Sequence, residues 1–308
     1  MILRIATRKS RLAMWQTEHV AEGLRRAHRD LEIRIVPLST RGDEILDRSL
    51  AEIGGKGLFL KELERAILDD EADIAVHSLK DVPAEMPDGL ELPVFLPRAN
   101  PADAWLSHAP GGIAALPAGA RVATSSLRRQ SQILHLRPDL QVVPLRGNVQ
   151  TRIDKWRGGH ARAIVLAAAG LQRLGLDSVI ERLLEPPQWL PAPGQGIIAV
   201  QCRSGDEAVR ERLASIHCPA TAQVAVAERA VVATMGGDCR MPLAALASVE
   251  SGRLSLRARL ASPDGAHACE DHVEGPAASG ASMGADLARR ILDSGGRGIL
   301  DALDIQET

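Results

Sequence analysis

The strongest constraint on the fold is a regular alternation of strand-like and helix-like segments near the N-terminus. Residues 3–7, 31–38 and 73–77 have the apolar pattern of short strands. Helical stripes separate them: Ser10 suits the N-cap of one, and residues 58–68 form the other. This β-α-β-α-β order predicts a parallel sheet covered by helices.

Two clusters of proline interrupt the alternation. The first comprises Pro83, Pro87, Pro93, Pro97 and Pro101, and the second comprises Pro186, Pro187, Pro191 and Pro193, before an apolar run at 197–200. Between the clusters the alternation resumes, with strands at 121–124, 141–146 and 162–167 and helices at 126–135, 148–157 and 170–174. Two proline-rich crossings predict two α/β lobes joined by a double hinge around a cleft, as in periplasmic-binding-protein-like folds that bind anions.

The C-terminal segment has a different order of elements. We expect a long helix at about 220–235, strands near 243–250, 254–261 and 267–274, and a helix near 281–294. This order predicts a small α+β domain. The expected fold class is therefore α/β with three domains: a discontinuous first lobe of residues 1–97 and 197–215, a second lobe of 98–196, and a C-terminal domain of 216–308.

Composition and charge narrow the class of partner. The 308 residues carry 37 Lys and Arg against 39 Asp and Glu, a formal net charge of −2, which argues against a nonspecific nucleic-acid binder. With two Phe, four Trp and no Tyr, the chain also has few stacking platforms for single strands. No apolar run is long enough to span a membrane, and the N-terminus has no secretory pattern. We expect a cytoplasmic protein with a small-molecule ligand.

Arginine greatly outnumbers lysine, 32 to 5. A GC-rich genome explains much of such a bias, and forked recognition of carboxylate or phosphate is the functional alternative. The positions of the arginines favour recognition of an anionic ligand, because ligands of open α/β sheets bind where strands end and helices begin. The arginines at such places are Arg8, Arg128, Arg129, Arg146, Arg152 and Arg173, and the neighbouring hydroxyls are Ser10, Thr124, Ser125 and Ser126. Together they predict a site for a ligand with several negative groups.

Asp81 is the acidic residue of this predicted site. It follows a strand-like run in the segment His77-Ser78-Leu79-Lys80-Asp81-Val82-Pro83. Its carboxylate could accept a hydrogen bond from a ligand N–H or stabilise a developing cation. A salt bridge or a cap that orders the turn before Pro83 explains it equally well. Lys80 is similarly ambiguous, whereas His77 is expected to pack in the strand rather than act as a base.

Residues 41–57 form a long polar connection, and loops of this length in compact domains are usually functional or mobile. The segment Gly54-Gly55-Lys56-Gly57 lacks the first glycine and the Ser/Thr of a phosphate-binding P-loop. We therefore expect a lid with glycine hinges and one cation, Lys56.

Four cysteines, Cys202, Cys218, Cys239 and Cys269, are widely spaced and form no CxxC pair, so neither a metal site nor a disulfide framework is expected. Cys239 lies in a glycine-containing loop after the long helix. The loop favours an accessible thiol, although a buried structural thiol is the commoner case. Asp238 would raise the pKa of this thiol and Arg240 would lower it, so its thiolate character stays open.

These same segments closely resemble the porphobilinogen deaminase (hydroxymethylbilane synthase) family over essentially the whole chain. The motifs that carry the resemblance are Arg4-Ile5-Ala6-Thr7-Arg8-Lys9-Ser10, Leu12-Ala13-Met14-Trp15-Gln16, Gly54-Gly55-Lys56-Gly57-Leu58-Phe59, Ala75-Val76-His77-Ser78-Leu79-Lys80-Asp81-Val82-Pro83, Thr124-Ser125-Ser126-Leu127-Arg128-Arg129-Gln130, Leu145-Arg146-Gly147-Asn148 and Pro193-Gly194-Gln195-Gly196. Each is specific, and they occur in the family's order.

The resemblance implies a monomeric enzyme that condenses four porphobilinogen units into a linear tetrapyrrole. It implies a dipyrromethane cofactor held by a thioether to Cys239, and Asp81 as the catalytic residue. Lys56 and Phe59 match the lid side of the site. The positions that match binding sites for cofactor or substrate carboxylates are Arg8, Ser10, Lys80, Thr124, Ser126, Arg128, Arg129, Arg146, Arg152 and Arg173.

One segment departs from the family pattern. Asp238 stands where a small residue precedes the cysteine, and Met241 stands where a β-branched residue precedes the proline. Two other classes of protein remain as alternatives: a bilobal anion-binding module without catalysis, and a different cysteine-dependent transferase. The module explains the lobes and the arginines, but it does not explain a loop cysteine in a third domain.

Overall fold

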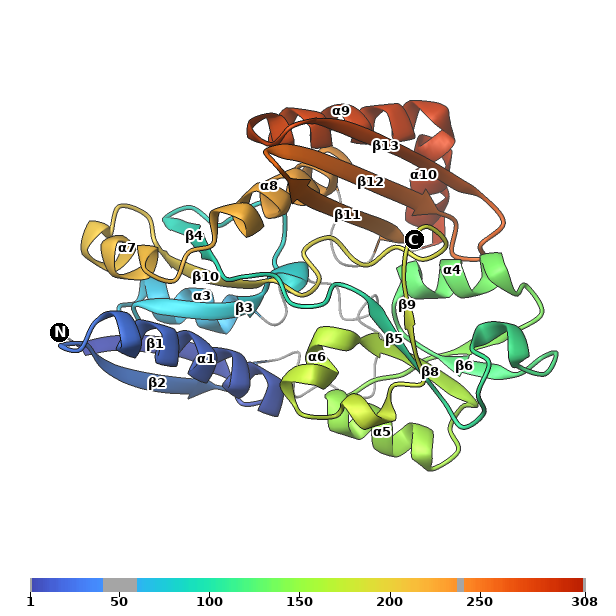
Figure 1. Ribbon diagram of the computed structural model, residues 1–308, viewed down its shortest axis with the longest axis horizontal. Helices are drawn as coiled ribbons and strands as arrows, with labels where there is room; N and C mark the ends of the chain where they lie inside the picture. Colours follow the sequence, from blue (N-terminus) through green and yellow to red (C-terminus); the bar gives the residue numbers. More distant parts are fainter. Residues whose placement is uncertain (1, 41–59, 237–240, 307–308) are drawn as a thin grey trace. The chain divides into compact units, whose positions relative to one another are not determined.

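The computed structural model describes residues 2–40, 60–236 and 241–306, and it divides into two compact units (Figure 1). The first unit is Met1–Ala99 with Gly196–Ala222, and the second is Asn100–Gln195 with Gln223–Thr308. The second unit holds two separate sheets, a five-stranded one and a three-stranded one. No helix in the described ranges is long and apolar enough to cross a membrane.

The first unit is built on a five-stranded sheet of order β2-β1-β3-β10-β4. Strands β1 (Ile2–Arg8), β2 (Glu32–Leu38) and β3 (Ile74–Ser78) are parallel, which confirms the orientation predicted for them. Strand β10 (Ile198–Arg203) returns from the second proline cluster and pairs antiparallel with both β3 and β4 (Leu90–Phe95). The apolar run at 197–200 thus contributes an interior strand to the first sheet, between two strands that precede it by more than 100 residues.

Helices cover both faces of this sheet. On one face, helix α1 (Arg11–Ala27) packs Val20 and Leu24 against Leu3 and Ile5, together with helix α7 (Glu207–Ala214). On the other face, helix α3 (Lys61–Leu68) packs against the alternate strand positions. Because side chains alternate along a strand, one short apolar strand supplies both cores.

The five-stranded sheet of the second unit has the order β7-β6-β8-β5-β9. Its strands β6 (Arg121–Ala123), β7 (Gln141–Val143) and β8 (Ala163–Ala167) are parallel. Strand β5 (Asp103–Ser107) runs antiparallel to both of its neighbours, β8 and β9 (Arg182–Leu184). Helices α4 (Leu127–Leu136), α5 (Val149–Arg157) and α6 (Ala168–Arg173) follow the three parallel strands. Strand β7 ends at Val143, earlier than the expected 141–146, so Arg146 lies beyond the strand.

The three-stranded sheet is an antiparallel meander of β11 (Leu243–Glu250), β12 (Arg253–Ala261) and β13 (Ala268–Pro276). Helix α9 (Gly280–Ile291) lies across one face of it (Figure 1), and helix α8 (Pro219–Thr234) packs against α9. A Cβ at Gly284 would lie 2.3 Å from the Ala227 carbonyl oxygen, so glycine is needed for this approach. After a π-helical turn, Leu292–Gly296, the chain forms helix α10 (Arg297–Gln306), which the sequence pattern did not predict.

Candidate functional site

In the first unit, Asp81 is presented by a short turn at the end of the central strand β3. The turn is a single 3₁₀ helix, Leu79–Asp81, fixed by the buried Leu79, whose amide donates to the Ile197 carbonyl at 3.0 Å. The Asp81 side chain itself is exposed, and among the described residues its carboxylate has neither a hydrogen bond nor an ion pair. The catalytic role of Asp81 and the alternative role as a cap or salt-bridge residue both stay predictions.

Other predicted residues lie at the same edge of this sheet. Strands β1 and β3 are parallel neighbours, so their carboxyl ends lie on the same side of the sheet. Arg8 at the end of β1 and Lys80 after β3 therefore lie on that side together with Asp81. Ser10 follows Arg8 and caps helix α1, where its Oγ accepts from the Ala13 amide at 3.3 Å. A hydroxyl that caps through a lone pair still has its proton available for a ligand.

His77 is a packed strand residue, as expected. Only 6 % of its surface is exposed, and its Nε2 lies 2.9 Å from Oε1 of Gln201 on β10. Burial lowers the pKa of His77 to about 4, and the smaller effects of Asp81 and Arg8 oppose each other. The imidazole is therefore neutral at pH 7, and its role is to support the strand that ends beside Asp81.

In the second unit, the predicted hydroxyls shape the turn between β6 and α4. Thr124 Oγ1 accepts from the Ser126 amide at 3.1 Å, and Ser126 Oγ caps α4 by accepting from the Arg129 amide at 3.4 Å. Ser125 Oγ exchanges hydrogen bonds with the backbone of Leu145, which joins the ends of β6 and β7. These hydroxyls fix the backbone from which Arg128 and Arg129 project.

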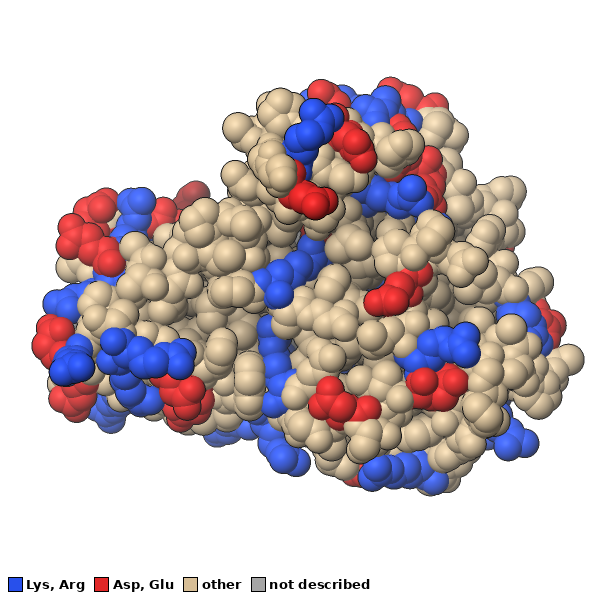
Figure 2. Space-filling model, in the orientation of Figure 1, with Lys and Arg blue, Asp and Glu red and all other residues tan. Residues whose placement is uncertain are grey.

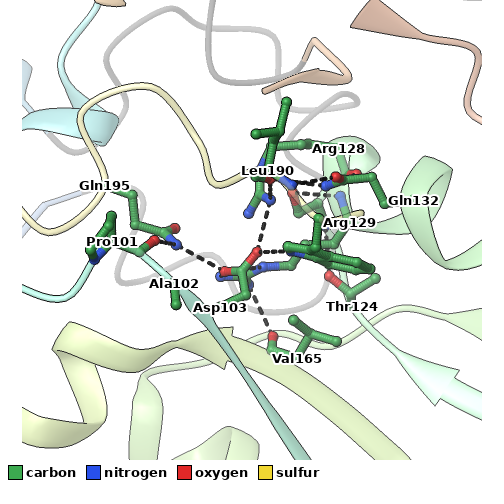
Figure 3. Close-up of polar contacts among 12 residues, drawn as sticks. Pro101, Ala102, Asp103, Thr124, Arg128, Arg129, Gln132, Val165, Leu190 and Gln195 are labelled. Atoms are coloured by element: carbon green, nitrogen blue, oxygen red, sulfur yellow. Dashed lines mark hydrogen bonds and ion pairs between the residues drawn. The ribbon is translucent and has the colours of Figure 1, made fainter. Parts of the chain in front are cut away.

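Arg128 and Arg129 are buried against the carboxylate of Asp103 (Figure 3). Arg128 Nη1 lies 2.8 Å from Asp103 Oδ2 and donates to the Leu190 carbonyl at 2.7 Å. Arg129 donates to Asp103 Oδ1 through Nε at 3.1 Å and Nη2 at 2.7 Å, and through Nη1 to the Val165 carbonyl. Asp103 was not among the residues predicted from the sequence, although a carboxylate at the start of an apolar strand is a visible signal.

Arg146 and Arg152 flank a tight turn at Gly147. That glycine has φ +111°, and a Cβ there would lie 2.7 Å from Thr151 Cγ2, so a larger residue does not fit. Arg152 Nε donates to the Gly147 carbonyl at 2.7 Å, and Asn148 caps α5. The half-buried Arg146 guanidinium has no ion-pair partner in the part of the chain that the structure describes.

Arg173 ends helix α6 and is largely buried, and this burial lowers the pKa of its guanidinium to about 10. Arg128 is buried as well, and its Nε–H has no acceptor among the described residues. Bound carboxylates would offset the desolvation of such cations. The arginines of the second unit therefore fit a ligand that carries several carboxylates.

Three of the predicted residues, Lys56, Phe59 and Cys239, lie outside the described residues. In the described ranges, no group of three or more His, Cys, Asp or Glu side chains is arranged to hold a metal ion.

Comparison with known proteins matches nearly the whole chain to one family. The family model described as "Porphobilinogen deaminase, dipyromethane cofactor binding domain" matches residues 3–211, and the model of the C-terminal domain of the same family matches residues 222–293. Curated proteins named porphobilinogen deaminase are similar: one from Stenotrophomonas maltophilia (strain R551-3) is 51 % identical over 299 residues, 97 % of this chain and 99 % of the relative.

A second relative of that name, from Xanthomonas oryzae pv. oryzae (strain PXO99A), is 51 % identical over 301 residues, 98 % of this chain and 99 % of the relative. Among solved structures, the periplasmic VFT2 domain of Bordetella pertussis BvgS superposes with a TM-score of 0.43 and 17 % identity, over 70 % of this chain and 86 % of that domain.

Proposed function

The chain belongs to the porphobilinogen deaminase family, and on that premise we propose which of its residues carry out the reaction. The reaction is the stepwise deaminating condensation of four porphobilinogen units into the linear tetrapyrrole hydroxymethylbilane, primed by a covalently bound dipyrromethane. The protein is thus an enzyme of porphyrin and haem biosynthesis. We assign it to the transferases, as a hydroxymethylbilane synthase, because each step joins a substrate-derived pyrrolylmethyl group to another ring.

Asp81 is the proposed catalytic residue, and its placement is the observation that carries the proposal. Its carboxylate is exposed, yet a turn with a buried anchor at Leu79 fixes its backbone. An anion held in this way is preorganised to stabilise positive charge without first having to break a contact to a described residue.

The chemistry at Asp81 follows from the substrate. The C–N bond of the aminomethyl group breaks, ammonia leaves with the bonding electron pair, and positive charge develops on the pyrrole and its methylene carbon. The Asp81 carboxylate would accept a hydrogen bond from the pyrrole N–H and stabilise that charge. The α-carbon of the neighbouring pyrrole ring then forms a C–C bond to this methylene carbon. That α-carbon loses its proton, which restores the aromatic ring.

The arginines would bind the acetate and propionate groups. Each pyrrole ring carries two carboxylates, and a planar guanidinium can bind a carboxylate through two parallel hydrogen bonds. Arg8, Ser10 and Lys80 are proposed for this role in the first unit. In the second unit the proposed residues are Thr124, Ser126, Arg128, Arg129, Arg146, Arg152 and Arg173.

The residues present fit a dipyrromethane, because its carboxylates match the cationic excess around α4, α5 and α6. We propose that Cys239 holds it through a thioether, and that Lys56 and Phe59 belong to a lid over the site. When bound, the dipyrromethane supplies the pyrrole α-carbon to which the first substrate unit is joined. The protein's own contribution is to bind carboxylates and to place Asp81.

We also propose a cytoplasmic monomer that acts without a nucleic-acid or membrane partner. The formal net charge of −2 favours the absence of a nonspecific nucleic-acid partner. Basic and acidic side chains lie beside one another along the outer margins of the face in Figure 2.

The stoichiometry of ammonia release tests the proposed function. Purified protein incubated with porphobilinogen should release four molecules of ammonia for each tetrapyrrole formed. A noncatalytic anion-binding module would bind porphobilinogen without releasing ammonia. A different cysteine-dependent transferase would show another product or another ratio, and either result would contradict the proposal.

A further inference from the structure

One buried carboxylate organises two of the proposed binding arginines. Asp103 has no exposed surface, and it opens strand β5 directly after the first proline cluster. Both of its oxygens form ion pairs with guanidinium groups, Oδ2 with Arg128 at 2.8 Å and Oδ1 with Arg129 at 2.7 Å. Figure 3 shows the three side chains converging. The orientation of each fork is therefore set by Asp103 rather than by solvent.

The same carboxylate also holds the second proline-rich crossing. Trp189 Nε1 donates to Asp103 Oδ2 at 2.8 Å, and Gln195 Nε2 donates to Oδ1 at 3.0 Å. Gln195 also donates to the Pro101 carbonyl at 2.7 Å, which joins the two crossings. Asp103 thus connects β5, the start of α4 and residues 189–195 within the second unit.

The charges in this cluster do not balance. Two guanidinium groups face one carboxylate, and the Arg128 Nε–H is buried without an acceptor among the described residues. Burial alone would raise the pKa of the Asp103 carboxyl, but Arg128 and Arg129 hold it well below its usual range. The carboxylate stays ionised, so among the described residues the cluster has one more positive than negative charge, which a carboxylate of the ligand could neutralise.

We propose that Asp103 is a positioning residue for the reaction. Its carboxylate fixes the guanidinium groups of Arg128 and Arg129 in the orientation that binds a carboxylate of the ligand. This inference rests on the binding roles proposed above for the two arginines. A purely stabilising role explains the cluster less well, because a buried ion pair commonly adds little to stability compared with apolar residues of similar size.

The first unit supplies a matched control. Asp73, just before β3, is also buried and also paired with two arginines: Arg4 Nη2 lies 2.7 Å from it, and Arg203 Nη2 lies 3.2 Å from it. No predicted site residue within the described ranges takes part in that cluster. A substitution at Asp73 therefore reports the cost of disturbing a buried ion cluster without disturbing the binding arginines.

The experiment compares Asp103→Asn, Asp103→Glu and Asp73→Asn. For each variant the fraction with covalent dipyrromethane is measured by intact mass, and KM, kcat and the melting temperature are measured on the same preparation. In Asp103→Asn we expect a smaller fraction of protein that carries covalent dipyrromethane. We also expect kcat/KM to fall about 10–100-fold, mainly through a higher KM, because losses of this size follow when binding groups are misplaced. Asp103→Glu should recover part of the loaded fraction and part of kcat/KM. Asp73→Asn should lower the melting temperature but carry covalent dipyrromethane to the same extent as wild type.

If Asp103→Asn lowers only the melting temperature, Asp103 is structural and the inference is wrong. If Asp103→Asn does not fold, Trp189→Phe removes a single donor to Asp103 and should shift KM in the same direction; an unchanged KM there also overturns the inference. Arg128→Leu separates the two proposals. Normal loading and KM in Arg128→Leu contradict the binding role itself, whereas a defect there with a normal Asp103→Asn contradicts only the positioning role.

Discussion

The carboxylate of Glu228, in the middle of α8, accepts a hydrogen bond from the backbone amide of Gly194 at 2.6 Å. Its other oxygen accepts from the Ala247 amide on β11 at 2.7 Å, and the side chain is fully buried. One glutamate therefore joins helix α8 both to strand β11 and to the second proline cluster, which lies 34 residues earlier in the sequence. The resemblance motifs include Gly194, but they gave no reason to single out Glu228.

Glu228→Ala should be strongly destabilising, because it leaves two buried amides without acceptors. Each unsatisfied amide costs about 1–3 kcal/mol, so we expect the free energy of unfolding to fall by about that amount or more. Chemical denaturation of the two proteins measures the difference. Glu250→Ala, an exposed position at the end of β11, is the control and should change little. Equal stability in Glu228→Ala and wild type would show that water or other groups satisfy these amides.

Arg146→Leu should raise KM for porphobilinogen with little effect on stability, since the guanidinium has no ion-pair partner among the described residues. Arg146→Lys should recover only part of the loss, because an ammonium cannot form two parallel hydrogen bonds to a carboxylate. Steady-state kinetics of both variants, with exposed Arg157→Leu as the control, measure the effect. Wild-type kinetics in Arg146→Leu would show that this arginine belongs to the solvated surface.

His77 should make stability depend on pH. Its pKa is lowered from 6.5 to about 4 in the folded protein, so between these values the unfolded chain binds a proton that the folded protein does not. The stabilisation is present above about pH 6.5 and decreases as the pH falls towards 4, by about 3 kcal/mol in total. His77→Gln, which keeps a partner for Gln201, should lose less stability than wild type between pH 7.5 and 5.0. Parallel losses in unfolding experiments would contradict this.

The cysteines should differ sharply in cofactor attachment. Cys239→Ser should carry no covalent dipyrromethane, since a hydroxyl is a far poorer nucleophile at neutral pH. Cys202→Ser should load normally, because the Cys202 thiol is fully buried and burial raises its pKa to about 12. Cys218→Ser and Cys269→Ser should also load. Intact masses decide the matter, and a loaded Cys239→Ser or an unloaded Cys202→Ser would overturn the attachment site.

The local pattern was enough to predict the parallel part of each sheet, but not its completion. Strands β1, β2 and β3 follow one another through helices, and that order determines their direction. The direction of β10 depends on the proline-rich connection that leads the chain from the second unit back to the first. The direction of β5 depends in the same way on the connection that leads the chain into the second unit. Both are long-range features, and an apolar run alone does not contain them.

The candidate site shows the same limit. The position of Asp81 after a strand was visible in the sequence, because strand ends and turns have local signals. The burial of Arg128 and Arg129 was not, since these residues of helix α4 are buried against Asp103, which lies on strand β5, 26 residues before Arg129. Arginines at strand ends were expected to be open to ligand, whereas these two share a buried carboxylate that holds them in place.

The turnover of Asp81→Asn, measured with its melting temperature on one preparation, tests the central claim most directly. Asparagine keeps the shape and an acceptor but removes the charge, and loss of a preorganised electrostatic partner typically costs on the order of 10²–10³ in turnover. Asp81→Glu keeps the charge but displaces it, and should retain part of the activity. We predict a large loss of turnover in Asp81→Asn with little change in melting temperature. A lowered melting temperature with normal turnover would instead identify Asp81 as a structural residue and contradict the mechanism.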